Sequence, residues 1–574
     1  MALENTFIGL IVMWVISLTP IEKRREEDNV KTQQYLAEAP TSPGSKRTVR
    51  SAVHELMLKH GVFRIFGNPG SNELPFLSDL PEEIEYVLGL HEQVVVGMAD
   101  GFAQASGEVA FVNLHAASGT GNAMGALTNS FYSRSPLVIS AGQQVRETIG
   151  IHSFLSNVDA AQLTKPLTKW SCEPTSASDV PRSFNEAVMQ AQASAPGPVY
   201  LSIPYDDWDH EANANDELLL RRSYSEENEL SAAAVEHLSG LISAAMRPAI
   251  ILGSAVDTVG ANGAAVTLAE NSGADVYLAP SPYRLPFPNK HGQFRGVLPA
   301  SIHAVNTTLA AYDLVLVIGA PVFRYHQHVP GQYLSDEVDL IHITDDPNEA
   351  ARAPFGTAVV TNIKRAVELL AEAVPPQESV IELRQQGFPA TEAPVAGVFD
   401  PARVFALLRE HAPTGTSYVV ESTSTNSDFW AQMDLQEPGS YFWPASGGLG
   451  FGMPAAVGVQ MALADRQVIG IIGDGSANYG ITALWTAAQY DIPVVFIVLK
   501  NGTYGALRWF SELLNTPDVP GVNVPGIDFV SLAHGYGVEA RTAENEGDFI
   551  DALAEAVASR KPCLIEVCTN LTQP

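Results

Sequence analysis

The stretch Gln467–Asn478, QVIGIIGDGSAN, decides the fold of this chain. It predicts a buried strand that ends at Gly-Asp-Gly, with a helix predicted shortly afterwards over Ile481–Gln489. A second apolar run, Pro493–Leu499, then leads into Asn-Gly-Thr. This order is typical of a right-handed βαβ unit, whose two strand ends can lie side by side. Asp474 and Asn501 are therefore expected to meet, although they stand 27 residues apart.

The residue types at these two strand ends suit a diphosphate and its metal. Glycines on both sides of Asp474 let the backbone turn tightly, and the amides at the start of the following helix can bind an anion. A carboxylate, the Asn501 amide oxygen and a main-chain carbonyl from the Thr503 segment are hard ligands that fit Mg²⁺. Gly-Asp-Gly alone is often only a turn, so the flanking strands and helix carry this interpretation.

Competing motifs are incomplete. Asn478 stands where a dinucleotide fingerprint needs its last glycine, and Gly-Lys, which a Walker A loop requires, never occurs. His91-Glu92 begins like a zinc-protease helix, but Val95 replaces the second histidine. There is no G-x-S-x-G nucleophile elbow either.

The rest of the chain shows the same pattern of strands and helices. At 574 residues it should form about three or four domains, and short apolar runs ending in Gly, Asn or Ser alternate with amphipathic stretches from Thr48 onward. We expect an α/β protein with three doubly wound parallel-sheet domains, separated by linkers over 206–228 and 375–398. We expect a disordered leader over 1–47 and domains over 48–225, 226–390 and 391–574.

Net charge and cysteine content exclude some classes of function. Thirty-three basic and sixty-four acidic residues give a net charge of −31, which argues against nucleic-acid binding and means that an anionic substrate needs local donors. Three cysteines provide neither a disulfide framework nor a four-ligand zinc site, and they suit a reducing cytoplasm.

The N-terminus allows three interpretations. Phe7–Leu18 is an apolar run of 12 residues, shorter than the roughly 20 that span a bilayer. Basic residues follow this run instead of preceding it, which reverses the charge order of a secretory signal. A disordered or misassigned leader is favoured over a short membrane-associating segment and over an atypical signal, so membrane association is not expected.

The spacing of Asp474 and Asn501 resembles the signature of thiamine diphosphate enzymes. Long, ordered matches extend over nearly everything after Thr48 and are similar to the benzoylformate decarboxylase family. They include FGNPGSNELPFL, NLHAASGTGNAMGAL, GPVYLSIPYDDWD, VLVIGAPVFRYHQ, GDGSANY, ALWTAAQY and NGTYGALRWF. The resemblance implies an aminopyrimidine-binding domain, a middle domain and a diphosphate-binding domain. It also implies a homotetramer with its sites at dimer interfaces.

The resemblance also implies residue roles. Glu92 corresponds to the glutamate that hydrogen-bonds the aminopyrimidine and promotes ylid formation, while Ser71, His115 and His326 correspond to polar groups around the substrate. The metal ligands would be Asp474, Asn501 and Thr503. Cofactor contacts would come from Thr423, Ser424, Gly447, Leu449, Gly475, Ser476 and Tyr504. The apolar substrate pocket would contain Trp443, Leu507 and Phe510.

Two positions depart from the family pattern. Trp443 stands where the family has Phe, which puts the size of the substrate in doubt, and Lys500 replaces the first Asn of an Asn-Asn pair. The resulting prediction is a carboxy-lyase, dependent on thiamine diphosphate and Mg²⁺, that converts an aromatic 2-oxo acid, foremost benzoylformate, into an aldehyde and CO₂ in mandelate catabolism. The alternatives are another thiamine diphosphate-dependent 2-oxo acid decarboxylase or carboligase, and a catalytically silent cofactor-binding subunit.

Overall fold

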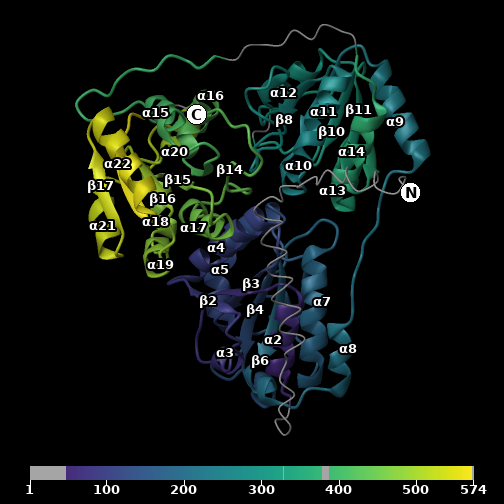
Figure 1. Cartoon of the computed structure of the whole chain (residues 1–574), viewed down its shortest axis with the longest axis vertical. Coiled ribbons are helices and arrows are strands. Elements are labelled where there is room, and N and C mark those ends of the chain that lie inside the picture. The colour runs from purple at the N-terminus through teal and green to yellow at the C-terminus, as the bar shows by residue number, and fades with distance from the viewer. Residues whose placement is uncertain (1–46, 327–328, 378–386, 572–574) are drawn as a thin grey trace, which may run out of the picture. The chain divides into compact units, whose positions relative to one another are not determined.

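The computed structural model describes residues 47–326, 329–377 and 387–571, and they contain three six-stranded, wholly parallel sheets flanked by helices (Figure 1). The expected α/β fold of three parallel-sheet domains is thus confirmed. The predicted leader, except for its last residue, Arg47, lies outside the described residues. No helix within those described ranges combines the length and the apolar character needed to cross a membrane.

The first sheet has the order β2-β1-β3-β4-β6-β5. Its strands are β1 (Arg64–Asn68), β2 (Glu85–Leu88), β3 (Ala110–Leu114), β4 (Leu137–Gln143), β5 (Trp170–Cys172) and β6 (Val199–Pro204). The helices of this domain are α2 (Val49–Lys59), α3 (Leu74–Leu77), α4 (Glu92–Ser106), α5 (Ala116–Tyr132), α6 (Arg146–Ile149), α7 (Val180–Gln192) and α8 (Glu217–Leu220).

The middle sheet has the order β12-β11-β10-β7-β8-β9. Its strands are β7 (Pro248–Leu252), β8 (Asp275–Leu278), β9 (Phe294–Val297), β10 (Leu314–Ile318), β11 (Asp339–Thr344) and β12 (Thr357–Val360). The helices are α9 (Ala232–Ala244), α10 (Ser254–Thr258), α11 (Asn262–Ser272), α12 (Ile302–Leu309), α13 (Pro347–Arg352) and α14 (Ile363–Ala373).

The third sheet has the order β14-β13-β15-β16-β18-β17, which repeats the order of the first sheet. Its strands are β13 (Ser417–Glu421), β14 (Tyr441–Phe442), β15 (Val468–Gly473), β16 (Val495–Lys500), β17 (Glu539–Ala543) and β18 (Cys563–Cys568). The helices are α15 (Pro401–His411), α16 (Asn426–Gln432), α17 (Gly452–Ala462), α18 (Asp474–Gly480), α19 (Ala483–Gln489), α20 (Gly505–Leu513), α21 (Phe529–Gly535) and α22 (Glu546–Ser559).

The strand orders create a switch point in each sheet. The chain leaves the first strand of each sheet in one direction and later returns on its other side, so the switch points lie between β1 and β3, β7 and β10, and β13 and β15. Open α/β sheets bind ligands outside the carboxyl ends of the strands at such points. The continuous apolar runs of β10 and β15 are typical of strands covered on both faces.

The predicted linker over 206–228 is wrong in its first part. Residues 205–220 form short helical turns against the first domain, where the backbone of Val49 bonds His210 and that of Ala212 bonds Arg47. The Lys59 ammonium also donates to the carbonyl of Arg222 at 2.7 Å. The prediction relied on acidic composition, which gives no information about these backbone hydrogen bonds. The exposed connection covers only 221–229.

Helices α4 and α17 join the first and third domains through close backbone contact. A Cβ at Gly458 would lie 1.9 Å from the carbonyl oxygen of Met98, and one at Gly101 would lie 2.3 Å from that of Ala455. Glycine is therefore required at both positions. Because α4 begins at Glu92, this contact fixes the position of a predicted catalytic residue.

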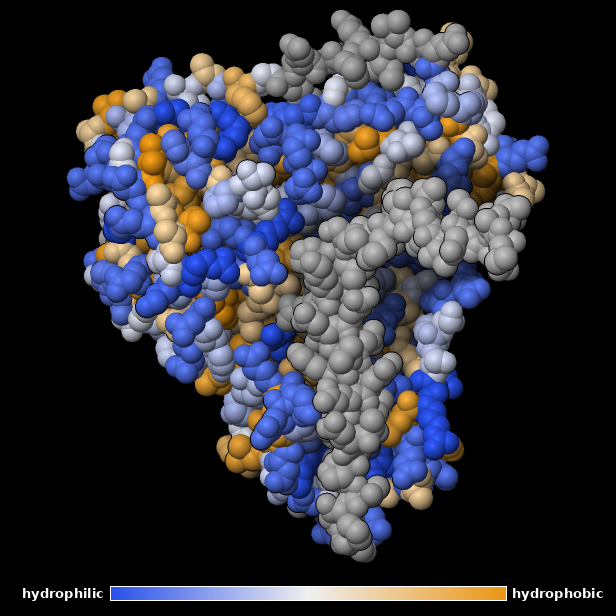
Figure 2. Space-filling view, in the orientation of Figure 1, coloured by the Kyte–Doolittle hydropathy of each residue, from blue (hydrophilic) through white to orange (hydrophobic). Residues whose placement is uncertain are grey.

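Hydrophilic residues predominate on the face drawn in Figure 2, with hydrophobic residues scattered between them. Such a surface is expected for a protein with 64 acidic and 33 basic residues.

Candidate active site

The two strand ends predicted to meet in the third domain are adjacent. Gly473 pairs with Leu499 across β15 and β16, and Oδ2 of Asp474 accepts hydrogen bonds from the amides of Asn501 at 3.1 Å and Gly502 at 2.6 Å. The Asn501 side-chain oxygen in turn accepts from the amide of Thr503 at 3.0 Å. The three predicted metal ligands therefore belong to one hydrogen-bonded unit.

The chemistry of this unit fits Mg²⁺ and a diphosphate. Asp474 is 3% exposed, and burial raises the pKa of its carboxyl while three backbone amides oppose that shift. A cation beside it would favour the ionised carboxylate. A Cβ at Gly475 would lie 2.6 Å from the ring of Tyr504, so only glycine allows the backbone to approach this closely. The set contains a single carboxylate and oxygen donors of the kind that Mg²⁺ accepts.

The other predicted diphosphate contacts come from neighbouring segments. Thr423 and Ser424 lie on a short 3-10 helix, Thr423–Thr425, directly after β13, across the switch point from Asp474. Ser476 is buried in the first turn of α18. A Cβ at Gly505 would lie 3.0 Å from Oγ of Ser424, so the start of α20 contacts the same segment.

A buried glutamate that the sequence analysis missed holds the loop of Gly447 and Leu449. Glu421, at the end of β13, accepts hydrogen bonds from the amides of Gly450, Phe451 and Gly452 at 2.8, 3.1 and 2.9 Å. Burial raises the pKa of the Glu421 carboxyl to about 7. Gly447 has a φ of +76°, which favours glycine.

This loop touches the first domain beside Glu92. The carbonyl of Leu449 accepts from Nε2 of Gln93 at 3.2 Å, and the carbonyl of Gly448 accepts from Asn129 at 2.8 Å. The loop predicted to carry the aminopyrimidine contact is thus fixed from both domains.

Glu92 lies at the start of α4, 7% exposed and held from two sides. Its Oε1 accepts from Nδ2 of Asn68 at 3.3 Å, and its Oε2 accepts from Nδ2 of Asn122 at 3.0 Å. Neutral amide donors fix the carboxylate without adding a counter-charge. This leaves its charge available for a ligand.

Ser71 and His115 follow β1 and β3, on the two sides of the switch point of the first sheet. A Cβ at Gly70 would lie 2.1 Å from Nδ1 of His115, so the loop before Ser71 lies directly against the imidazole. The Ser71 hydroxyl donates to Oδ1 of Asn72 at 3.3 Å.

A second missed residue, Glu73, orients His115. Its Oε2 lies 2.8 Å from Nδ1 of His115. It is 1% exposed and also accepts from the amides of Gly70, Ala116 and Gly142 at 2.9, 3.2 and 2.9 Å. An ionised carboxylate only accepts, so Nδ1 carries the hydrogen and Nε2 remains available for proton transfer.

His326 and Phe510 lie together, although they come from different domains. Their ring centroids are 4.9 Å apart at an interplanar angle of 70°. Leu507, on the same helix α20 as Phe510, is 51% exposed. Trp443 is partly buried and stacks on Tyr441 at 6.5 Å with an interplanar angle of 11°.

Within one chain, Ser71, Glu92 and His115 belong to the first domain, while Asp474, Asn501 and Thr503 belong to the third. Among the described residues, no hydrogen bond or ion pair joins Ser71, Glu92 or His115 to the Asp474–Asn501 unit. The first sheet and the third sheet therefore each carry one group of predicted site residues at their switch points. We call these two groups the half-sites.

Comparisons with known families give matches in all three domains. Three thiamine pyrophosphate enzyme families match the chain: the N-terminal TPP binding domain over residues 47–163, the central domain over 235–370 and the C-terminal TPP binding domain over 422–567. These matches, the three sheets and the two half-sites define a thiamine diphosphate enzyme.

Comparison with individual relatives identifies the family within this class of enzymes. Benzoylformate decarboxylase of Pseudomonas aeruginosa is 54% identical over 528 residues, which is 92% of this chain and 100% of the relative. The structure of a thiamine diphosphate-dependent 4-hydroxybenzoylformate decarboxylase from Rhodococcus jostii RHA1 is 56% identical with a TM-score of 0.90, covering 92% of this chain and 100% of its own. Benzoylformate decarboxylase from Polynucleobacter necessarius is 33% identical with a TM-score of 0.88, covering 92% and 99%. The chain belongs to the benzoylformate decarboxylase family.

Proposed function

We propose that this enzyme decarboxylates benzoylformate to benzaldehyde and CO₂, with thiamine diphosphate and Mg²⁺ as cofactors. The observation that carries the proposal is the set of Ser71, Glu92 and His115 around the switch point of the first sheet, in a chain 54% identical to a benzoylformate decarboxylase. A silent subunit would have no need for Glu73 to orient His115 at 2.8 Å.

The chain's own residues have distinct parts in the reaction. When bound, thiamine diphosphate supplies a nucleophilic carbon for the oxo group and accepts the electron pair that CO₂ leaves behind. Glu92, fixed by Asn68 and Asn122, hydrogen-bonds the aminopyrimidine ring. Asp474, Asn501 and Thr503 would hold Mg²⁺ at the diphosphate.

The remaining groups bind the substrate and move protons. The Ser71 hydroxyl binds the carboxylate of the substrate, and Nε2 of His115 exchanges a proton with the oxo oxygen. His326 is the second proton carrier, and its edge-to-face contact with Phe510 sets its orientation at the aryl pocket. Trp443 and Leu507 would line the same pocket, and their apolar side chains match an aryl group.

We also propose that the enzyme is a homotetramer whose sites form between the two subunits of each dimer. The separation of the two half-sites within one chain supports this assembly. Exposed apolar groups near the diphosphate half-site, Leu507 at 51% and Tyr479 at 47%, suit coverage by a second copy. We further propose that the enzyme is cytoplasmic and that it takes part in mandelate catabolism.

The deciding experiment measures CO₂ release from benzoylformate, 4-hydroxybenzoylformate, phenylpyruvate and pyruvate, with and without both cofactors. Benzoylformate should give the highest kcat/KM, and chelation of Mg²⁺ should abolish turnover. A preference for pyruvate would identify a different 2-oxo acid decarboxylase, and binding of thiamine diphosphate without CO₂ release would identify a silent subunit.

The role of Glu92 has its own test. Glu92→Gln keeps the shape and one of the two oxygens that accept from the asparagines but removes the charge, so it should fold normally and lose most activity, roughly 100-fold or more in kcat. Full activity in that variant would refute the assignment.

A further inference from the structure

Lys500 departs from the family pattern, and the proposed function gives it no role. It is the last residue of β16 and directly precedes Asn501, a predicted metal ligand. An asparagine at this position would be neutral, whereas a lysine brings a positive charge to the end of the strand. The departure therefore adds a charge next to a site that is proposed to bind a divalent cation.

The ammonium of Lys500 is paired with a buried carboxylate. Nζ of Lys500 lies 3.0 Å from Oε2 of Glu566, whose side chain is 7% exposed, against 25% for that of Lys500. Glu566 belongs to the neighbouring strand β18, in which Cys568 is in register with Lys500. Within the described ranges, Lys500 forms no other ion pair. Each of the two charges is thus the direct counter-charge of the other.

Neutral donors complete the surroundings of Glu566. Its Oε1 accepts from the hydroxyl of Thr542 at 3.3 Å, and its Oε2 accepts from the amide of Phe529 at 3.4 Å. These groups hold the carboxylate in place but carry no charge, so Lys500 alone neutralises it. Replacing either member of the ion pair by a neutral residue would leave the other as an unpaired charge.

The charge of Lys500 acts on the half-site of the third domain. Burial raises the pKa of the Asp474 carboxyl, and the charge of Lys500 is among the groups that oppose this shift. A positive charge that attracts the Asp474 carboxylate also repels a cation bound to it. The negative charge of Glu566 offsets that repulsion. The affinity for a cation should therefore depend on the balance between these two charges.

We propose that Lys500 and Glu566 together set the affinity of the third-domain half-site for its divalent cation. Both are positioning residues, because they act on the metal through Asp474 and Asn501 and do not ligate it. The inference rests on the proposed metal ligands and deepens the proposed function, since it adds a charge pair that adjusts how tightly the metal is bound.

The test measures the binding of Mn²⁺ to the metal-free enzyme in the presence of thiamine diphosphate, using the electron paramagnetic resonance signal of the free ion. Mn²⁺ takes the same oxygen ligands as Mg²⁺. Glu566→Gln leaves Lys500 unpaired and should raise the Kd for Mn²⁺ roughly threefold to tenfold. Lys500→Gln leaves Glu566 unpaired and should lower that Kd by a similar factor. The double variant has neither charge, so its Kd should lie within about twofold of the wild-type value.

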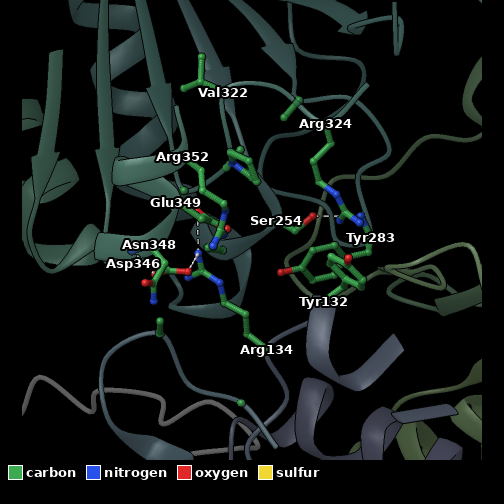
Figure 3. A pocket seen from close by; sticks show the side chains of 18 of the residues that line it. Tyr132, Arg134, Ser254, Tyr283, Val322, Arg324, Asp346, Asn348, Glu349 and Arg352 are labelled. Atoms are coloured by element: carbon green, nitrogen blue, oxygen red, sulfur yellow. Dashed lines mark hydrogen bonds and ion pairs between the residues drawn. The ribbon is translucent and has the colours of Figure 1, made fainter. Parts of the chain in front are cut away.

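Glu349→Gln is the matched control. Glu349 is also a largely buried glutamate that is paired with a cation: its carboxylate lies 2.7 Å from the guanidinium of Arg134, and the two side chains are 10% and 15% exposed. Figure 3 shows this pair, which connects α13 of the middle domain to the segment after α5. The chemical change is the same as in Glu566→Gln, but it lies in another domain than the metal ligands. This variant should bind Mn²⁺ like the wild type.

Shifts of opposite sign in the two single variants, with a return toward the wild-type Kd in the double variant, would support the proposal. An ion pair that only holds β16 to β18 would give weaker Mn²⁺ binding in all three variants, and that result would overturn it. Unchanged Kd values in all three would overturn it as well. If the wild type itself bound no Mn²⁺, the proposed metal site would be refuted, and this inference with it.

Discussion

At the scale of single residues, the buried carboxylate of Glu73 determines what His115 can do. It fixes one ring nitrogen and, through three backbone amides, ties the loop before Ser71 to β3 and β4. We expect Glu73 to be a positioning residue that acts through the orientation of His115.

Glu73→Gln should therefore lower kcat roughly 100-fold with a much smaller change in KM, because proton transfer is impaired and substrate binding is retained. Glu85→Gln is the control: Glu85 is an exposed glutamate of β2 paired with Arg64, and its variant should behave like the wild type. A loss of thermal stability in Glu73→Gln that accounts for the whole fall in kcat would mean that Glu73 only supports the fold.

Glu73 is also an example of a residue whose role could not be predicted from the sequence. Ser71 and His115 could be predicted because the segments around them resemble a family and follow apolar runs. Glu73 lies between Asn72 and Leu74 in a loop-like segment, where a glutamate is normally solvated. Its burial depends on amides from residues 70, 116 and 142, which only the folded sheet brings together.

At the scale of elements, Glu421 attaches the loop of Gly447 and Leu449 to β13 and makes stability depend on pH. Its folded pKa of about 7 exceeds the ordinary value of 4.5. The folded state therefore retains this proton where the unfolded chain releases it. The resulting stabilisation, about 3 kcal/mol at most, is fully present below pH 4.5 and is lost as the pH rises through 7.

Glu421→Gln should remove this part of the pH dependence. We expect the fall in Tm between about pH 5 and about pH 8 to be smaller in the variant than in the wild type. Calorimetry of both proteins at the two pH values measures the fall in Tm. The contribution of the other titrating groups cancels when the fall in the variant is subtracted from that in the wild type. Equal falls in Tm would contradict a protonated Glu421.

The contact of α4 with α17 gives a second prediction for an element. Gly458→Ala forces a Cβ onto the backbone of Met98, so the helices must separate at a cost of about 1–3 kcal/mol. Activity should fall as well, because α4 carries Glu92. Gly240→Ala in α9 is the control: nothing lies within 4 Å of its added Cβ, and better helix propensity should stabilise it slightly. Thermal unfolding and kcat of both variants test the contact.

At the scale of the whole molecule, periodicity and strand-end residues were enough to predict three parallel-sheet domains and the meeting of Asp474 with Asn501. They could not give the strand orders, because alternating strands and helices are compatible with several orders. The close approach of Gly253 to Gly319 in the middle domain was missed for the same reason. Gly253 and Gly319 stand 66 residues apart, and only the neighbouring positions of β7 and β10 bring them together.

The separation of the half-sites gives the last prediction, which concerns the assembly. If each site takes Glu92 from one subunit and Asp474 from another, two inactive variants can complement each other. Glu92→Gln and Asp474→Ala should each be nearly inactive alone. When both are coexpressed, half of randomly formed dimers are mixed, and each mixed dimer has one site with both native residues and one with neither. Such a population should recover about a quarter of the wild-type kcat per chain.

Sites confined to a single chain would give no recovery, because every chain then carries a defect in its own site. Differently tagged copies allow the mixed dimers to be purified, and these should reach about half of the wild-type activity. The matched control coexpresses Glu92→Gln with Ser71→Ala. Both of those changes lie in the first-domain half-site, so each site of a mixed dimer keeps one defect and activity should stay low. Recovery in this control would point to subunit effects other than a shared site.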